Sequence, residues 1–344
     1  MPADESAEQQ CQGRAQPLPE RSYNEPNSSL RPAWFDWAVG CPLTAHQVDV
    51  EGCEINYLRW GHSGDDASDD ADSCADSGSK LEPTTEVNSR LGLPGLLFIH
   101  GGGAHARWWQ FLAPFFSADF DVAAIDLSGM GDSGHRSNYD SDQRGREVRA
   151  VLDHLRFGRD TYVVGHSLGG FIGMRFAAAY GERVAGMVIV DSPISPPGAP
   201  ATEPPPDLPP HKFHPSRAAA MSRFRVLPSQ PCENDFILKF IAQHSVRKMT
   251  QGWQWKFDAK GMGQSSVGPR DAQCLASMRC PGALIYGARS ALVNKDTAAY
   301  MGSLMGPQAP AVAVPDAYHH VMLDQPLAFV SALRSILALW RMRS

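Results

Sequence analysis

The pentapeptide Gly165-His166-Ser167-Leu168-Gly169 places a serine between glycines, a pattern that can expose a nucleophilic hydroxyl group. A mostly apolar run at 161–164 precedes it, and a helix-like run at 170–179 follows it. Strand, sharp turn and helix form the context that this pattern requires, because the turn strains the serine backbone and crowds its neighbours. Glycine on both sides relieves that crowding. The sequence therefore predicts that Ser167 is an active nucleophile.

A serine hydroxyl becomes a strong nucleophile only when a base removes its proton, and histidine titrates in the right range for this task. A carboxylate must then orient the imidazole ring and stabilise its protonated form. A histidine and an acidic residue from elsewhere in the chain are therefore needed beside Ser167.

Three consecutive glycines, in His100-Gly101-Gly102-Gly103, follow another apolar run at 96–99. Glycine lets backbone N–H groups approach a developing negative charge closely. This segment is therefore a candidate for the part of an acyl-transfer site that stabilises an oxyanion.

Apolar runs alternate with helix-like segments from residue 93 onward, which is the pattern of a parallel sheet with helices on both faces. An antiparallel hairpin over 46–61, with its turn at Glu51-Gly52, is predicted to precede this α/β region. Residues 193–272 interrupt the alternation with prolines and helical segments, and we expect them to form a lid over the carboxyl ends of the strands. The expected helices occupy 108–116, 144–157, 171–180, 216–226, 235–249 and 327–341.

Two polar segments are predicted to be disordered, the first before and the second within a folded domain at 33–344. Residues 1–32 form a tail with scattered prolines, and residues 62–90 are rich in aspartate, serine and glycine. Such segments cannot bury enough apolar surface to offset the entropy lost on ordering. The second segment also lacks the ligand spacing and closing glutamate of a calcium-binding loop.

The composition of the 344 residues argues against several classes of protein. A net charge of −6 does not favour nucleic acid as a partner. The seven cysteines are scattered without a C-x-x-C pair, which favours reduced thiols over a disulfide framework. We find neither a targeting segment nor an apolar run long enough to span a bilayer, so we expect a cytoplasmic protein without a membrane span.

Two patterns are similar to cofactor or metal sites, but their contexts do not support that reading. Residues 129–134 match G-x-G-x-x-G, yet loop-like residues follow them where a dinucleotide-binding fold would open a helix. His211 and His214 lie among prolines without cysteine or acidic neighbours, and no H-E-x-x-H motif is present. We therefore predict neither a cofactor nor a metal.

From about Val48 to the C-terminus, the chain resembles the α/β-hydrolase fold family. Four motifs occur in the family's order: the glycines after His100, the loop at 126–133, the Ser167 pentapeptide, and a segment at 318–326 similar to G-H-x-x-x-x-[DE]-x-P. The resemblance implies a mostly parallel sheet with helices on both faces and a helical lid inserted after the sixth strand.

The resemblance also implies which residues carry the chemistry. Ser167 is the nucleophile. The adjacent residues His319 and His320 are the candidate bases, and counting back from Pro326 favours His319. The family's chain order of serine, acid and histidine can be met by this sequence. The implied oxyanion donors are the backbone amides of Gly102 and Leu168.

The acid departs from the commonest family pattern. Its usual position, in Gly287-Ala288-Arg289-Ser290, holds a serine that cannot serve as the acid. Some esterase-type members resemble this chain in having the acid in a D-x-P context after the sixth strand, which implies Asp191. Asp296 is the next candidate. Because Asp191 precedes a Ser-Pro pair, it could instead cap the following loop.

The implied reaction is hydrolysis of a small, apolar ester through an acyl-enzyme intermediate. A serine in the turn argues against family members that use a carboxylate nucleophile. One alternative is a carbon–carbon bond hydrolase of the same fold, for which Arg175 or Arg289 could bind an acidic substrate. Another is a non-catalytic, ligand-binding member. The arginines at 217, 223 and 225 are interpreted as a solvated helix face.

Overall fold

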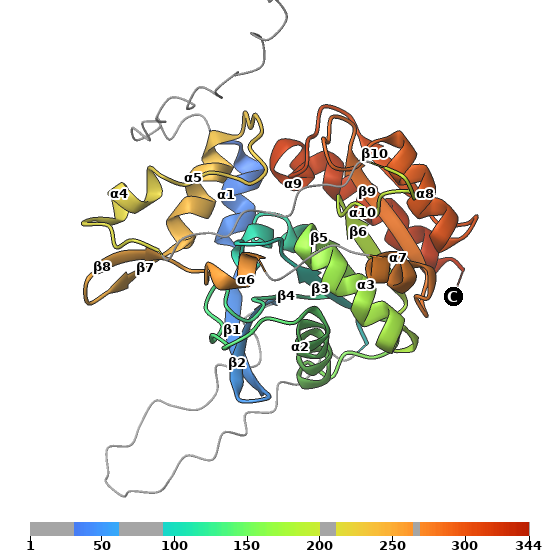
Figure 1. Ribbon diagram of the computed structural model, residues 1–344, viewed down its shortest axis with the longest axis horizontal. Helices are drawn as coiled ribbons and strands as arrows, with labels where there is room; N and C mark the ends of the chain where they lie inside the picture. The colour runs from blue at the N-terminus through green and yellow to red at the C-terminus, as the bar shows by residue number, and fades with distance from the viewer. Residues whose placement is uncertain (1–30, 62–91, 200–210, 264–268, 344) are drawn as a thin grey trace, which may run out of the picture.

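The computed structural model describes residues 31–61, 92–199, 211–263 and 269–343 (Figure 1). The predicted tail, apart from its last two residues, and the predicted acidic insertion at 62–90 lie outside the described residues. Part of the predicted lid region at 193–272 also lies outside them.

An eight-stranded sheet forms the centre of the structure, with the strand order β1-β2-β4-β3-β5-β6-β9-β10. The pairs β1–β2 and β2–β4 are antiparallel, and all the other neighbours are parallel. The predicted mostly parallel sheet is therefore confirmed. The strands are β1 Leu43–Val50, β2 Cys53–Trp60, β3 Gly95–Ile99, β4 Asp121–Ile125, β5 Tyr162–His166, β6 Gly186–Val190, β9 Gly282–Gly287 and β10 Ala311–Val314.

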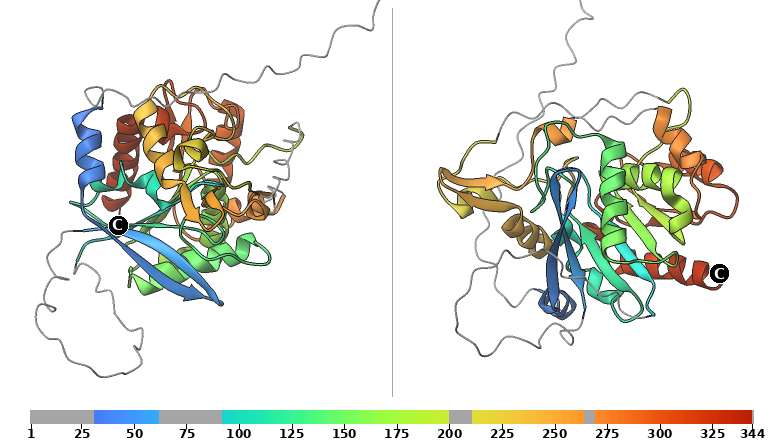
Figure 2. Two further views of the ribbon diagram at one scale, coloured as in Figure 1. Left: turned by 90° about the vertical axis from the view of Figure 1, so that its left-hand side faces the viewer. Right: turned by 90° about the horizontal axis from the view of Figure 1, so that it is seen from below.

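The predicted hairpin at the start of the sheet is present, with Val50 paired to Cys53 across a two-residue turn. Both turn residues have positive φ, 53° at Glu51 and 75° at Gly52. Such a turn matches the right-handed twist of the two strands that it joins. Figure 2 shows β1 and β2 as one long ribbon at this end of the sheet.

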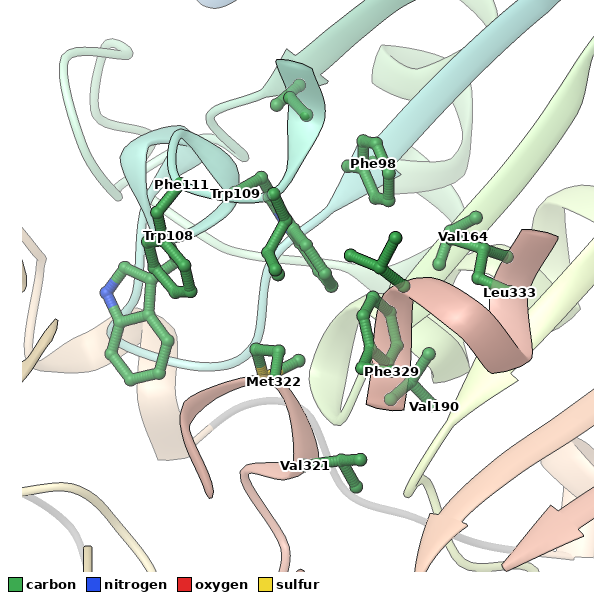
Figure 3. Close-up of a cluster of buried hydrophobic side chains, with 14 of the residues drawn as sticks. Phe98, Trp108, Trp109, Phe111, Val164, Val190, Val321, Met322, Phe329 and Leu333 are labelled. Atoms are coloured by element: carbon green, nitrogen blue, oxygen red, sulfur yellow. The ribbon is translucent and has the colours of Figure 1, made fainter. Parts of the chain in front are cut away.

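The sheet separates two apolar layers, because successive side chains along each strand point to opposite faces. In β3, Leu96 and Phe98 belong to one buried cluster, whereas Leu97 and Ile99 belong to the other. The first layer includes α10 (Pro326–Arg341), which Figure 3 shows with Phe329 and Leu333 near Phe98. The second layer includes α2 Ser141–His154, α3 Leu168–Tyr180 and α8 Lys295–Met305.

The helix expected at 108–116 is wrong in type. The chain forms two short 3₁₀ helices there, η2 (Ala106–Trp109) and η3 (Ala113–Phe115). Pro114 explains the break, because proline lacks the N–H that an α-helix needs and its ring clashes with the carbonyl four residues earlier. The apolar residues are still buried, and Trp109 stacks on Phe98 with ring centroids 4.7 Å apart.

Between β6 and β9 the chain leaves the sheet, as expected. Figures 1 and 2 place the part from α4 to β8 at the opposite end of the molecule from α8 and β10. The helix expected over 235–249 ends at His244, and the last four residues form a strand because they pair with a second strand in a hairpin. The elements are α4 Arg217–Met221, α5 Asp235–His244, β7 Val246–Met249, β8 Gly252–Trp255, α6 Lys260–Gly263 and α7 Pro269–Ala276.

Helix α1 (Ala33–Gly40) fastens this excursion to the rest of the domain. Its Phe35 is fully buried and meets Phe236 of α5 edge to face, with ring centroids 4.9 Å apart. Phe35 also packs near Phe111, which follows η2. No helix among the described residues is both long enough and apolar enough to cross a membrane.

Candidate active site

Ser167 lies in the sharp turn between β5 and α3. Its backbone has φ 52° and ψ −118°, a conformation that residues with a side chain rarely adopt. The turn is held because the Ser167 N–H donates to the Val190 carbonyl at 3.0 Å, which ties it to β6. Leu168 begins α3, so its N–H is one of those that receive no partner within the helix. The strained turn therefore places the Ser167 hydroxyl beside the N-terminus of α3, where the Leu168 N–H has no partner within the helix.

The glycines of the pentapeptide are required by close backbone contacts. A Cβ at Gly165 would collide with the carbonyl of Gly169, and a Cβ at Gly169 would collide with the carbonyl of Ile99. These contacts bring the end of β3 and the start of α3 together. The loop that follows β3 is thereby placed next to the serine.

Gly165→Ala is expected to destabilise the protein by roughly 1–3 kcal/mol, because rigid backbone rather than a side chain meets the new methyl group. Gly302→Ala is the matched control. It lies in α8 with nothing within 4 Å of the added Cβ, so it should stabilise by roughly 0.5–1 kcal/mol. Urea unfolding of both variants measures this difference, and equal midpoints would contradict the packing argument.

His319 lies next to Ser167 in the loop between β10 and α9 (Val321–Asp324). The Ser167 hydroxyl is placed to donate to His319 Nε2 at 3.1 Å. On the other side of the ring, His319 Nδ1–H donates to Asp191 Oδ1 at 2.9 Å. The imidazole and the carboxylate are both buried. The structure thus brings together the three residues that the sequence singled out.

Asp191 stands at the end of β6 in a backbone conformation with φ 47°. Its Oδ2 accepts the Gly287 N–H at 2.8 Å, and its Oδ1 also accepts the Ser290 hydroxyl at 2.7 Å. Ser290 Oγ in turn accepts the N–H groups of Leu292 and Val293. Ser290 therefore helps to hold the Asp191 carboxylate in place.

The other candidate acid, Asp296, lies exposed in the first turn of α8. The loop-cap alternative for Asp191 does not describe its contacts, because its two oxygens receive Gly287, Ser290 and His319 rather than the loop that follows it.

Several polar contacts position the loop that carries His319. His166 Nε2–H donates to the His319 carbonyl at 3.1 Å. Asp324 accepts the Tyr318 N–H at 2.7 Å, and Gln230 bridges Asp324 and the His320 N–H. Sequence reasoning did not single out Gln230, because no local pattern connects it with a loop about ninety residues away.

His320 differs from its neighbour in its surroundings. It is buried, and neither of its ring nitrogens completes a hydrogen bond. Burial, with the nearby rings of His319 and His166, lowers its pKa well below the usual range. Burial likewise lowers the pKa of His166. Both rings are therefore neutral at physiological pH.

Among the described residues, His166, His319 and His320 form the one group of three side chains close enough to hold a metal ion, with ligand atoms within 4.8 Å of one another. Two of these rings already have hydrogen-bonding partners. Both nitrogens of His319 are engaged by Ser167 and Asp191, and His166 donates to a backbone carbonyl. Hydrogen bonds within the protein therefore engage two of the three rings.

The glycine-rich loop at 129–134 wraps around a buried carboxylate. Asp126 accepts the side-chain amide of Asn56 and the N–H groups of Ala106 and Asp132. A Cβ at Gly131 would collide with this carboxylate. Burial raises the pKa of Asp126 to about 6. The glycine at 131 therefore lets the loop close around Asp126, and the next helix, α2, begins only at Ser141.

A cavity of about 560 Å³ adjoins the site at Gly102, Gly103 and His320. This volume suits a small-molecule ligand. Aromatic side chains form much of its wall: Trp108 and Phe224 have ring centroids 6.4 Å apart, and Phe224 and Trp255 are 6.1 Å apart. The other side chains include three cations from the excursion between β6 and β9: Lys212, Arg223 and Arg225.

The two arginines suggested for an acidic substrate do not line this cavity. Arg175 pairs with Asp271 and Asp142, and Arg289 pairs with Asp316. The interpretation of 217, 223 and 225 as one solvated helix face is also wrong in part, because Arg223 and Arg225 follow the end of α4 and line the cavity.

The sequence of this chain matches the family model of the alpha/beta hydrolase family over residues 96–333. These residues include the serine turn and the His319 loop. The chain belongs to the alpha/beta hydrolase family. The predicted family and fold are confirmed.

Two curated relatives and one solved structure illustrate the range of this alpha/beta hydrolase's similarities. It is 26% identical over 258 residues to an esterase of Mycobacterium tuberculosis, covering 71% of this chain and 83% of the esterase. It is 33% identical over 144 residues to the dihydrolipoyllysine-residue acetyltransferase component of the acetoin cleaving system of Pseudomonas putida. That match covers 42% of this chain and only 38% of the relative. The thioesterase domain from the curacin biosynthetic pathway superposes with a TM-score of 0.63 at 21% identity, covering 86% of this chain and 99% of the domain.

Proposed function

We propose that this alpha/beta hydrolase is a serine esterase that cleaves a small-molecule ester through an acyl-enzyme intermediate. The observation that carries the proposal is the continuous hydrogen-bonded line from the Ser167 hydroxyl through His319 to Asp191. The named activity of the Mycobacterium tuberculosis relative supports an ester as the substrate.

In the first step, His319 Nε2 takes the proton of Ser167 while the serine oxygen attacks the ester carbonyl carbon. Asp191 keeps the Nδ1 nitrogen protonated, so Nε2 faces the serine with its lone pair, and the carboxylate stabilises the imidazolium that forms. The same proton then passes to the departing alcohol. A water molecule then gives a proton to His319 and attacks the carbonyl carbon of the acyl-enzyme. His319 returns this proton to the Ser167 oxygen as the acid is released.

The negative charge on the carbonyl oxygen needs donors that are already in place. We assign this task to the backbone amides of Gly102 and Leu168. Leu168 contributes an amide at the N-terminus of α3, where the helix dipole also favours negative charge. Losing one donor of this kind costs about 2.7–4 kcal/mol of transition-state stabilisation in other serine hydrolases.

We also propose that the excursion between β6 and β9 acts as a lid. The cavity supports this assignment, because most of its lining side chains come from residues 211–257, whereas Gly102, Gly103 and Trp108 belong to the α/β core. A substrate in the cavity would then lie between the lid and the glycine loop.

The test is covalent labelling of the full chain with a fluorophosphonate, which reacts with activated serines. We expect one label per molecule, on the peptide that contains Ser167, and no label on Ser167→Ala. Ser192→Ala is the control and should keep the label on Ser167. Ser192 is a second serine beside the turn, but it is buried and its hydroxyl donates to the Ser167 carbonyl. An unlabelled wild-type protein would overturn the proposed function.

A further inference from the structure

The described lining of the cavity beside the serine turn carries permanent charge of one sign. Lys212, Arg223 and Arg225 contribute three permanent positive charges, and none of the described residues that line the cavity is an aspartate or glutamate. This contrasts with the chain as a whole, whose net charge is −6. A cleft lined by one sign of charge concentrates ligands of the opposite sign.

The cations are not committed to acidic partners within the described part of the chain. Arg225 donates only to the backbone carbonyls of Ser222 and Phe224. Arg223 and Lys212 are exposed and make no ion pair with a described residue. Nearby carboxylates are already engaged: Asp132 by Lys256, and Asp258 by Tyr139 and His135.

Two largely buried rings bound the inner part of the cavity. Trp108 and His320 both line it, and each is more than nine-tenths buried. The indole Nε1 of Trp108 and the ring nitrogens of His320 have almost no accessible surface, so a ligand in the cavity meets the carbon edges of these rings. Figure 3 shows the indole nitrogen on the side of Trp108 that is turned away from the apolar cluster. The inner end of the cavity therefore offers mainly apolar ring surface, and its permanent charges lie on Lys212, Arg223 and Arg225.

We propose that the ester hydrolysed at this site carries a carboxylate at the end remote from its reacting carbonyl. The inference rests on the proposed esterase function. The reacting ester lies at Gly102, an apolar segment contacts Trp108, Phe224 and Trp255, and the carboxylate meets Arg223 and Arg225. The sequence predicted an apolar ester. The proposal instead gives the substrate an apolar middle segment and a charged end.

Two matched pairs of esters test the proposal. Monomethyl adipate and methyl heptanoate differ in a carboxylate at the end of the acyl chain. The butanoyl ester of ω-hydroxyhexanoate and hexyl butanoate differ in a carboxylate at the end of the alcohol. In at least one pair, kcat/KM for the charged member should exceed that for the neutral member by about tenfold, falling towards equality at roughly 0.5 M salt.

Variants locate the cause of that preference. Arg223→Gln and Arg225→Gln should each reduce the charged-to-neutral ratio of kcat/KM by about two- to fivefold, the range expected of exposed charge contacts. Arg217→Gln is the matched control, since Arg217 belongs to α4, bonds the Gln243 carbonyl and does not line the cavity. It should leave the ratio unchanged. A charged-to-neutral ratio of kcat/KM that stays at the wild-type value in Arg223→Gln and Arg225→Gln, as in Arg217→Gln, would overturn the proposal.

Binding to the full-length Ser167→Ala variant separates this inference from the proposed function. Calorimetry should give a Kd for the preferred charged ester about tenfold below that of its neutral partner, whether or not the wild type turns it over. Hydrolysis of both pairs without any charge preference would overturn only the inference. Tighter binding of the charged ester by a wild type that hydrolyses no ester would overturn only the esterase function.

Discussion

Replacing Asp191 with asparagine is expected to lower kcat for ester hydrolysis by about 10⁴-fold. Asparagine fits the same space and can still accept the Gly287 N–H, but it no longer holds the Nδ1 proton of His319 and cannot stabilise the imidazolium. KM should change little, since Asp191 is fully buried and does not line the cavity. Steady-state kinetics measure this, with circular dichroism to verify folding.

Asp296→Asn is the control, because Asp296 is exposed in α8, and its kcat should stay near that of the wild type. A second change sharpens the test. In Asp191→Asn/Ser290→Asp the acid returns to the family's usual position, where the native Ser290 hydroxyl already reaches 2.7 Å from Asp191 Oδ1. We expect it to recover on the order of tenfold or more of the lost kcat. A loss below tenfold in Asp191→Asn would move the acid elsewhere.

His319→Gln is expected to lower kcat by about 10⁶-fold, because the nucleophile then has no base. His320→Gln should lower kcat/KM by at most about tenfold, mainly through a higher KM, because His320 lines the cavity. The two rings have centroids 4.8 Å apart, so distance alone does not distinguish them. Only His319 contacts both Ser167 and a carboxylate, whereas burial keeps His320 neutral.

Fluorophosphonate labelling offers a second measurement of the same contrast. Labelling of Ser167 should slow by orders of magnitude in His319→Gln and proceed within about tenfold of the wild-type rate in His320→Gln. Comparable losses in the two variants would mean that the histidines act together. A larger loss in His320→Gln would reverse their assignment.

The strands and the serine turn could be predicted because their determinants are local. Apolar runs of about five residues indicate buried strands, and the glycines around Ser167 report backbone contacts that tolerate no Cβ. The 108–116 region shows where local reading fails. Its apolar residues are buried as expected, but Pro114 breaks the helix into two short turns.

The amino-acid sequence by itself determined the alternating fold, the strained turn at Ser167 and the short set of residues able to serve it. Only the tertiary structure decided which members of that set meet. His319 lies 128 positions from Asp191 and 152 from Ser167. The register of the parallel strands brings all three residues together beyond the carboxyl ends of the strands. The cationic cavity was likewise invisible in the chain, because Arg217, Arg223 and Arg225 look alike in sequence. Local backbone demands are written in neighbouring residues, whereas contacts between distant residues depend on how the whole sheet and its helices pack.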